Sequence, residues 1–245
     1  YYMQNINFRN KYHLYSGKII LIALLIMCQT KMLAQRNVME NDLKFARKPY
    51  HFGIHLASGF GDFKIKHGAQ FATSDSILSI KSKYDVNFEI AALISYHINK
   101  YVELRTMPGF LFSNKSISYE FGDATFKKKA TPQVYFDLPV EVKIKSEPLK
   151  DIKLYMVAGL KYGYDVGSNF KDRRRPDQPI QKPNDFGVNY GVGIEIHFPL
   201  FILSPEFKMY NSFLNIHQGN DVLPYSKYIK GLYNRNFIFS INFEG

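Results

Sequence analysis

Cysteine is almost absent from this chain of 245 residues, which contains only Cys28. One thiol excludes both a disulfide framework and a metal cluster held by several thiolates. Tryptophan is missing altogether, but 21 Phe and 18 Tyr bring the aromatic content to 16%. Long intrinsic disorder is therefore not expected, because disordered chains are poor in aromatic residues. The length allows one sizeable domain or two small ones.

Long apolar runs are also missing. The unbroken apolar run at residues 19–28 has 10 residues, whereas a helix that crosses a bilayer needs about 20. Basic residues precede the run and small or polar residues around Ala34 follow it, which is the order found in a secretory signal peptide. We expect residues 1–35 to be a cleaved signal peptide and residues 36–48 to be a polar periplasmic linker.

Two alternatives for this segment are an N-terminal membrane anchor and lipidation at Cys28. The anchor is disfavoured by the short run. Lipidation is disfavoured because Met27 stands where a small residue is expected. The predicted signal peptide carries four of the 32 basic residues and no acidic one, so the remainder has 28 basic and 21 acidic residues and a charge of +7. This reduced basic excess, together with export, argues against a nucleic-acid partner.

From Tyr50 onward the dominant pattern is an alternation of apolar and polar residues. In residues 84–98, Phe88 and Ile90 share one face while Asn87 and Glu89 share the other. Successive side chains of a strand point to opposite faces, so this pattern predicts a strand with one apolar and one polar side. Eight such segments occur, at residues 50–58, 84–98, 101–112, 133–145, 153–166, 186–198, 201–210 and 236–243.

The connections between these segments alternate in length. Short links are expected near residues 99–100, 147–150 and 199, and long ones at 59–83, 113–132, 167–185 and 211–235. Outer-membrane barrels have short periplasmic turns and long extracellular loops, whereas a soluble sandwich does not force long loops to one end. We predict an all-β fold at residues 49–245, an eight-stranded antiparallel transmembrane β-barrel of the outer-membrane type, exported to the outer membrane of a Gram-negative bacterium.

The polar faces of the predicted strands carry charges of both signs. In an eight-stranded barrel side chains fill the interior, so we expect these charges to pair in the lumen. The filled interior excludes passage of folded cargo through this barrel alone. The predicted lumen network consists of Glu89, Glu103, Arg105, Asp137, Glu141, Lys143, Lys161, Asp165, Glu195, Glu206 and Lys208.

Seven short stretches between Lys48 and Ile216 carry a family resemblance through their order and spacing. They are Lys48-Pro49-Tyr50-His51-Phe52-Gly53-Ile54, Ser76-Ile77-Leu78-Ser79-Ile80, Leu104-Arg105-Thr106-Met107-Pro108-Gly109-Phe110, Leu138-Pro139-Val140-Glu141-Val142-Lys143, Gly159-Leu160-Lys161-Tyr162-Gly163-Tyr164-Asp165, Asn184-Asp185-Phe186-Gly187 and Ser204-Pro205-Glu206-Phe207-Lys208. The chain resembles the PorT family, outer-membrane β-barrel proteins of the type IX secretion and gliding-motility apparatus. The resemblance implies a role in exporting type IX cargo and in surface gliding, with other type IX components as partners and no catalytic residues to carry over. Because the filled interior excludes passage of folded cargo, we expect that role to be accessory and non-enzymatic.

Few residues are candidates for catalysis or metal binding. His55 and Ser58 lie close in sequence, and His51 shares a strand face with His55, but no third orienting group completes a triad. No carboxylate or cysteine stands at ligand spacing from these histidines. We therefore expect no catalytic residues, metal or cofactor, and keep a lipid-modifying barrel enzyme as one alternative function.

Two basic clusters fall in predicted long loops. Guanidinium and ammonium groups bind phosphate oxygens, so these clusters are candidates for contact with lipopolysaccharide or a protein partner, and solvated loop charge is the alternative. A structural or lipopolysaccharide-binding surface barrel is thus a second alternative function. The six residues are Lys127, Lys128, Lys129, Arg173, Arg174 and Arg175.

Overall fold

The computed structural model describes residues 48–68, 77–121, 126–167, 181–217 and 228–245, without the side chains of residues 77–78, 121 and 126–131. The predicted signal peptide and nearly all of the predicted linker lie outside these residues. Among the described residues no helix is long and apolar enough to cross a membrane. All regular structure in them is strand.

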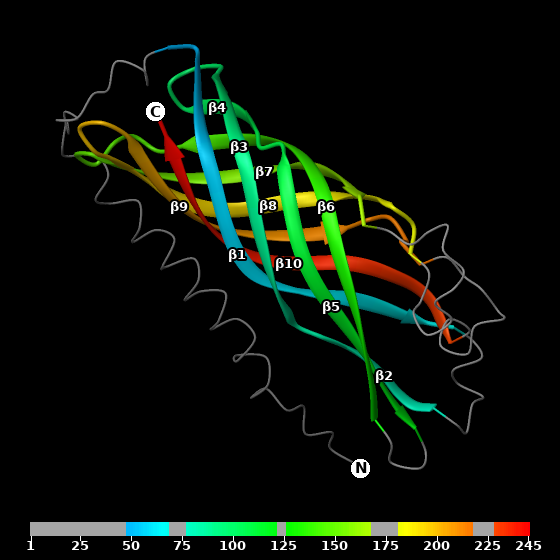
Figure 1. The fold of residues 1–245 in the computed structure, drawn as a ribbon. Helices are drawn as coiled ribbons and strands as arrows, with labels where there is room; N and C mark the ends of the chain where they lie inside the picture. The colour runs from blue at the N-terminus through cyan, green and yellow to red at the C-terminus, as the bar shows by residue number, and fades with distance from the viewer. Residues whose placement is uncertain (1–47, 69–76, 122–125, 168–180, 218–227) are drawn as a thin grey trace, which may run out of the picture. The chain divides into compact units, whose positions relative to one another are not determined.

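Ten strands form one antiparallel sheet (Figure 1). Their bounds are β1 (Tyr50–His67), β2 (Ile77–Lys83), β3 (Asp85–His97), β4 (Val102–Thr106), β5 (Gly109–Phe121), β6 (Phe126–Lys145), β7 (Ile152–Asp165), β8 (Asn184–His197), β9 (Ile202–Ser212) and β10 (Ile229–Glu244).

Two pairs of these strands are interrupted halves of one wall strand. Only Tyr84 separates β2 from β3, and only Met107 and Pro108 separate β4 from β5. Proline has no N–H to donate to a ladder, which explains the interruption at Pro108. β5 pairs with both β2 and β3, and β6 pairs with both β4 and β5. The sheet therefore has eight wall strands, as predicted.

The ring is closed by β1. This strand pairs with β10 on one side, from Gly53↔Glu244 onward, and with β3 on the other, from Tyr50↔Tyr96 onward. The remaining neighbours follow in chain order, so the ring is closed as far as the pair Gly61↔Asp85. Beyond that pair, the described residues of the β1 extension and of strand β2 are not paired with each other. The predicted eight-stranded antiparallel barrel is confirmed.

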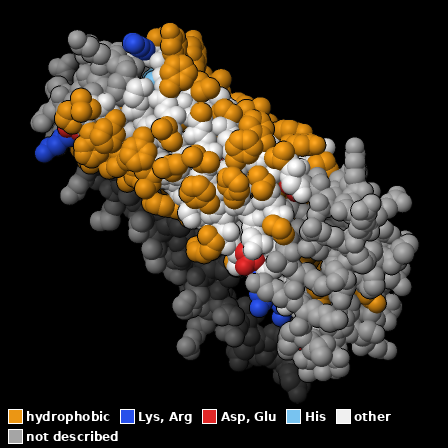
Figure 2. All heavy atoms as spheres, viewed as in Figure 1, with side chains coloured by type: hydrophobic (Ala, Val, Ile, Leu, Met, Phe, Trp, Pro, Cys, Tyr) orange, Lys and Arg blue, Asp and Glu red, His pale blue; other side chains and the backbone are white. Residues whose placement is uncertain are grey.

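The two faces of the wall are opposite in polarity. Phe88, Val140 and Ile194 point outward and are 47%, 51% and 38% exposed, and Figure 2 shows the apolar side chains gathered in a broad band over the strands. The alternate residues point inward and are buried, and most of them are polar or charged. An apolar exterior around a charged interior is the reverse of a soluble barrel and is typical of a wall surrounded by lipid.

Two of the four predicted long loops, at 59–83 and 113–132, are largely strand, so those boundaries were wrong. β1 runs to His67 and β2 begins at Ile77, within the expected loop at 59–83. β5 and β6 take up most of 113–132. The polarity reverses along these extensions: Phe63 and Ile117 are buried, whereas Lys64 is exposed. A water-exposed outer face explains the reversal and why these segments resemble loops in the sequence.

The two ends of the barrel differ in their connections. Residues 98–101, 146–151 and 198–201 make short turns at the end where β1 starts and β10 finishes; this is called the turn end. The opposite end, called the loop end, receives the longer connections, although those at 166–183 and 213–228 are shorter than the predicted 167–185 and 211–235. Figure 1 shows β2 and the adjoining ends of β5 and β6 reaching out at the loop end.

Candidate functional site: the barrel lumen

A cluster of four fully buried charges lies in the middle of the lumen. Nη2 of Arg105 on β4 is 2.7 Å from Oε2 of Glu141 on β6 and 2.7 Å from Oε2 of Glu206 on β9. Nζ of Lys208 is 3.0 Å from Glu206 and 3.5 Å from Glu141. Asn189 donates to Glu141 at 3.1 Å. Two cations thus face two carboxylates, which offsets part of the cost of burying each charge.

A second cluster lies toward the turn end and is centred on Lys143. Its Nζ is 2.5 Å from Glu195, 3.4 Å from Glu244 and 3.6 Å from Glu103. Lys145 makes a further ion pair with Glu103. Each of the three carboxylates also meets a histidine, and the pairs are His51–Glu244 at 2.5 Å, His97–Glu103 at 2.6 Å and His197–Glu195 at 3.4 Å.

A third group of polar side chains fills the lumen toward the loop end. Nζ of Lys161 is 2.6 Å from Asp137. Nζ of Lys115 donates to Asn234 at 2.6 Å, and Nδ2 of Asn234 donates to Asp185 at 2.6 Å. The two hydrogen bonds of Asn234 join β5, β10 and β8, which are not neighbours in the sheet. They therefore cross the lumen.

An apolar cluster closes the lumen at the loop end. It is built from inward-facing residues of the strand extensions and from Ile216. Tyr119 and Leu232 in it are completely buried. From turn end to loop end the interior is thus filled by ion pairs, then hydrogen bonds, then packed apolar side chains. The cluster consists of Phe63, Ile80, Ile117, Tyr119, Ile216, Ile229 and Leu232.

All eleven residues of the predicted lumen network lie in the interior, none more than 5% exposed. Nine of them form three groups of ion pairs rather than one network, and Asp165 and Glu89 belong to none of the three. Asp165 is joined to none of the other ten by a described ion pair, and its carboxylate accepts from the backbone N–H groups of Gly167 and Val134. Among the described ion pairs, Glu89 lies within 3.8 Å of His55.

Several residues that fill the lumen were not among the eleven predicted. Glu244 was not predicted because the last strand was expected to end at Phe243, whereas it ends at Glu244. Alternation from the outward-facing Phe243 already places Glu244 inward. Lys115 and Asp185 were missed because they fell in segments assigned to loops. His51, His97 and His197 alternate with apolar neighbours, which already places them on the polar faces of their strands. Glu195 lies two residues before His197, and Glu103 lies opposite His97 on the next strand, whereas Glu244 is remote in sequence from His51.

The candidate hydrolase residues do not meet. His55 is buried in the lumen, where Nδ1 lies 2.5 Å from Oδ1 of Asn242. Ser58 is exposed on the outer face of the same strand, and its hydroxyl donates to the backbone carbonyl of Asn87. A nucleophile and its base must lie within hydrogen-bond reach, so this pair cannot form a triad. Among the described residues no group of three His, Cys, Asp or Glu could hold a metal ion.

The two basic clusters assigned to loops have different outcomes. Lys127, Lys128 and Lys129 belong to strand β6 and pair with Tyr119, Ser118 and Ile117 of β5, so their assignment to a loop was wrong. Residues 173–175 lie outside the described part of the chain.

Comparisons with known proteins agree with this architecture. Residues 33–218 match the family model described as outer membrane protein beta-barrel domain. A search of curated proteins finds no match. Among solved structures, the chain is similar to the outer membrane protein OprG of Pseudomonas aeruginosa, with 9% identity over 80% of this chain and 93% of that one and a TM-score of 0.48.

Two further solved structures are similar. One is Ail of Yersinia pestis, in complex with the heparin analogue sucrose octasulfate, with 10% identity over 81% of this chain and 100% of that one and a TM-score of 0.37. The other is Neisserial surface protein A, with 12% identity over 78% and 95% and a TM-score of 0.39. These likenesses are too distant to indicate a ligand. The family model matches three quarters of the chain, so this chain belongs to the outer membrane protein β-barrel domain family.

Proposed function

We propose that this chain is a non-enzymatic outer-membrane barrel that acts as an accessory or assembly component of type IX protein secretion and gliding motility. The proposed role in secretion comes from the resemblance of the sequence to the PorT family. The observation that carries the accessory character is the closed lumen, above all the contacts of Arg105 with Glu141 and Glu206. A barrel filled in this way offers no path for a folded protein.

The position of the resemblance motifs supports the proposal. The stretches on β4, β6 and β9 that resemble the PorT family supply Arg105, Glu141, Glu206 and Lys208. These are the four charges of the central cluster. Three of the seven resembling stretches therefore supply residues whose ion pairs fill the middle of the lumen, which supports a component that does not itself conduct cargo.

The test is genetic. A strain of the encoding bacterium that lacks this chain should fail to secrete type IX cargo and fail to glide, and the intact gene supplied in trans should restore both. The tagged barrel, extracted from the outer membrane in detergent, should co-purify with a larger translocon subunit, whereas an equally tagged unrelated eight-stranded barrel should not. Normal secretion and gliding in the deletion strain would overturn the secretion role.

Measurements of ion conductance and of lipid turnover test the alternative functions of the barrel. The purified barrel in a planar bilayer should give no ion conductance above the protein-free baseline, since ion pairs cross its lumen. Turnover of lipid by the purified barrel, lost on His55→Ala, would favour a lipid-modifying enzyme instead. Intact secretion in the deletion strain, combined with a weakened cell surface, would favour a purely structural barrel.

A further inference from the structure

The strand extensions at the loop end carry five exposed lysines. Three of them surround one bond: N of Phe63 on β1 donates to Oγ of Ser82 on β2 at 2.8 Å. Lys64 follows Phe63, and Lys81 and Lys83 flank Ser82, so the three are brought together from two strands. The other two are Lys66 and Lys230, where Lys66 pairs in register with Gly231. The exposed set is Lys64, Lys66, Lys81, Lys83 and Lys230, called here the lysine crown.

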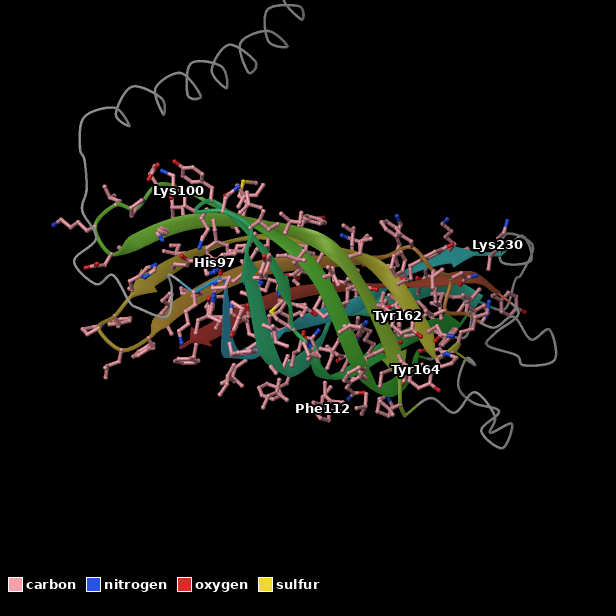
Figure 3. The ribbon with its side chains drawn as sticks, turned by 90° about the horizontal axis from the view of Figure 1, so that it is seen from above. His97, Lys100, Phe112, Tyr162, Tyr164 and Lys230 are labelled. Carbon is pink, nitrogen blue, oxygen red and sulfur yellow. The ribbon has the colours of Figure 1, made fainter. Side chains whose placement is uncertain are left out.

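The crown lies on the outer face of the extensions. Phe63 and Ile80 belong to the apolar cluster in the interior. Side chains alternate along a strand, so their neighbours Lys64 and Lys81 point away from that interior. Figure 3 shows Lys230 at the opposite end of the barrel from Lys100, which marks a short turn.

The depth of the crown follows from the residues just below it. Phe60 and Tyr84 are the last exposed aromatic residues on these strands, 56% and 54% exposed. Arg235 binds Asp62 through two hydrogen bonds and the hydroxyl of Tyr84 at 3.0 Å, and so marks a polar rim. Four residues from Phe60 to Lys64 span about 13 Å of strand, or about 10 Å of height at a tilt of about 40°.

That height corresponds to the polar layer of the membrane. The headgroup region adds roughly 5–8 Å to each side of the hydrocarbon core, and a lysine side chain can extend back toward it. Phosphate groups of lipids in the outer leaflet therefore come within reach of the crown, while the apolar wall below contacts their acyl chains. The crown thus continues the lipid-facing surface of the barrel.

The charge of the crown is not balanced within the described residues. No described ion pair includes any of the five lysines. Lys66 instead lies 4.8 Å from the ring centre of Tyr233. Of the nearby acids, Asp85 accepts from Ser116, and Glu120 is half-buried opposite Ser79. Positive charges gathered on one surface repel one another, so a bound external anion would lower that repulsion.

We propose that the lysine crown binds the phosphate groups of outer-leaflet lipopolysaccharide and thereby fixes the barrel at a defined depth in the membrane. The partner is a phosphorylated glycolipid because the surface combines a row of ammonium groups with an adjoining apolar wall. This inference goes beyond the accessory role in secretion and stands without it.

The test uses the full-length mature barrel in phosphatidylcholine nanodiscs, titrated with deep-rough lipopolysaccharide whose lipid A carries phosphates. A lysine near anionic lipid contributes about fivefold to affinity. The triple variant Lys64→Gln, Lys81→Gln, Lys83→Gln should therefore bind roughly 100-fold more weakly. The triple variant with arginine at the same positions should retain binding, because each charge is kept.

A matched control removes three lysines from the other end. Lys48, Lys100 and Lys150 are exposed at the turn end, and their replacement by Gln should leave the affinity unchanged. Correct folding of every variant is checked by the shift of the unheated barrel on a denaturing gel. If the crown variant fails to fold, single replacements of Lys64 and Lys83 by Gln should each weaken binding about fivefold.

Three outcomes would overturn the proposal. Equal binding of lipopolysaccharide stripped of its phosphates would show that phosphate is not the recognised group. Equal competition by inorganic phosphate or by a soluble sulfated polysaccharide would show that the lipid is not the source of the anion. An unchanged affinity of the folded crown variant would show that the binding lies elsewhere. None of these results depends on whether type IX cargo is secreted.

Discussion

Arg105 and Glu206 come from opposite walls of the barrel and meet at 2.7 Å in its centre. Three wall strands, β6, β7 and β8, separate their strands on one side, and the wall strands of β3, β1 and β10 separate them on the other. Lys143 and Glu244 make a similar crossing nearer the turn end, at 3.4 Å. An eight-stranded barrel is narrow enough for side chains to span it, and here they do so as ion pairs.

The first prediction concerns the central cluster. Arg105→Ala should lower the free energy of unfolding by about 3–5 kcal/mol, because two buried carboxylates lose a cation. Arg105→Met combined with Glu206→Met should be less destabilising than Arg105→Met alone, since a carboxylate is no longer left uncompensated. Urea unfolding in lipid vesicles, followed by tyrosine fluorescence, measures each value. A double variant no more stable than the single one would contradict the coupling.

The second prediction tests which side of the wall contacts lipid. Val140→Arg, in the outward band of β6, should destabilise the barrel by about 2–4 kcal/mol if that position lies near the bilayer midplane. Tyr50→Arg, at the start of β1 on the turn-end rim, should cost only about 0–1 kcal/mol. Both wild-type side chains are about half exposed, so exposure cannot account for a difference. Equal costs in vesicle unfolding experiments would argue against a lipid-facing band.

The third prediction concerns Gly193. A methyl group added at this glycine would overlap Cζ of Tyr155, whose ring covers it from the neighbouring strand β7. Tyr155 is held between the cationic groups of Arg105 and Lys143, at 6.0 Å and 4.4 Å from its ring centre. Gly193→Ala should therefore cost about 1–3 kcal/mol through overpacking.

The control for this contact is the variant Tyr155→Leu. In that background Gly193→Ala should cost measurably less, because the ring that it displaces is gone. A double-mutant cycle on unfolding free energies gives the coupling directly. Additive costs would mean that the glycine is required for some other reason.

The fourth prediction is a pH effect in the short turn between β6 and β7. Hydrogen bonds from Tyr101 and Lys100 lower the pKa of the Glu147 carboxyl below its ordinary 4.5. A lowered carboxyl pKa stabilises the fold above the ordinary pKa, and this contribution is lost as the pH falls through the folded-state value. Because Glu147 is exposed, the effect on overall stability should be small.

Carboxyl NMR shifts measure this pKa directly. Tyr101→Phe should raise the midpoint of Glu147 toward its ordinary value, because the Tyr101 hydroxyl donates the hydrogen bond that lowers this pKa most. Lys100→Gln should raise it as well, through loss of the 3.1 Å ion pair. A midpoint that stays unchanged in both variants would mean that the turn does not hold these contacts in solution.

Much of the membrane-embedded fold follows from local sequence pattern. Alternation at residues 84–98 predicted both the strand and its faces. Phe88 is favourable only on the side of the wall that faces lipid, and Glu89 only on the side that faces the lumen. The strand extensions were missed because the same alternation reverses its polarity around Phe63 and Lys64 once the outer face meets water. A rule that assigns the apolar side outward fails at that boundary.

The site was harder to predict than the fold. The sequence indicated that Glu103, Lys143 and Glu195 face inward, but not that they share one cluster, because their strands pair through register and barrel closure. Separate clusters replace the single network expected, since the charges occur at different heights along the wall. The lysine crown was not recognised either, because Lys64 and Lys81 are brought together only by the bond between Phe63 and Ser82.

The sequence by itself determined an all-β chain with one apolar and one charged face per strand, because side-chain direction along a strand depends only on local alternation. Only the tertiary structure decided which charges meet across the lumen and that five lysines from β1, β2 and β10 lie together at one end. Those outcomes depend on ring closure and strand register, which set distances between residues as remote in sequence as Arg105 and Glu206.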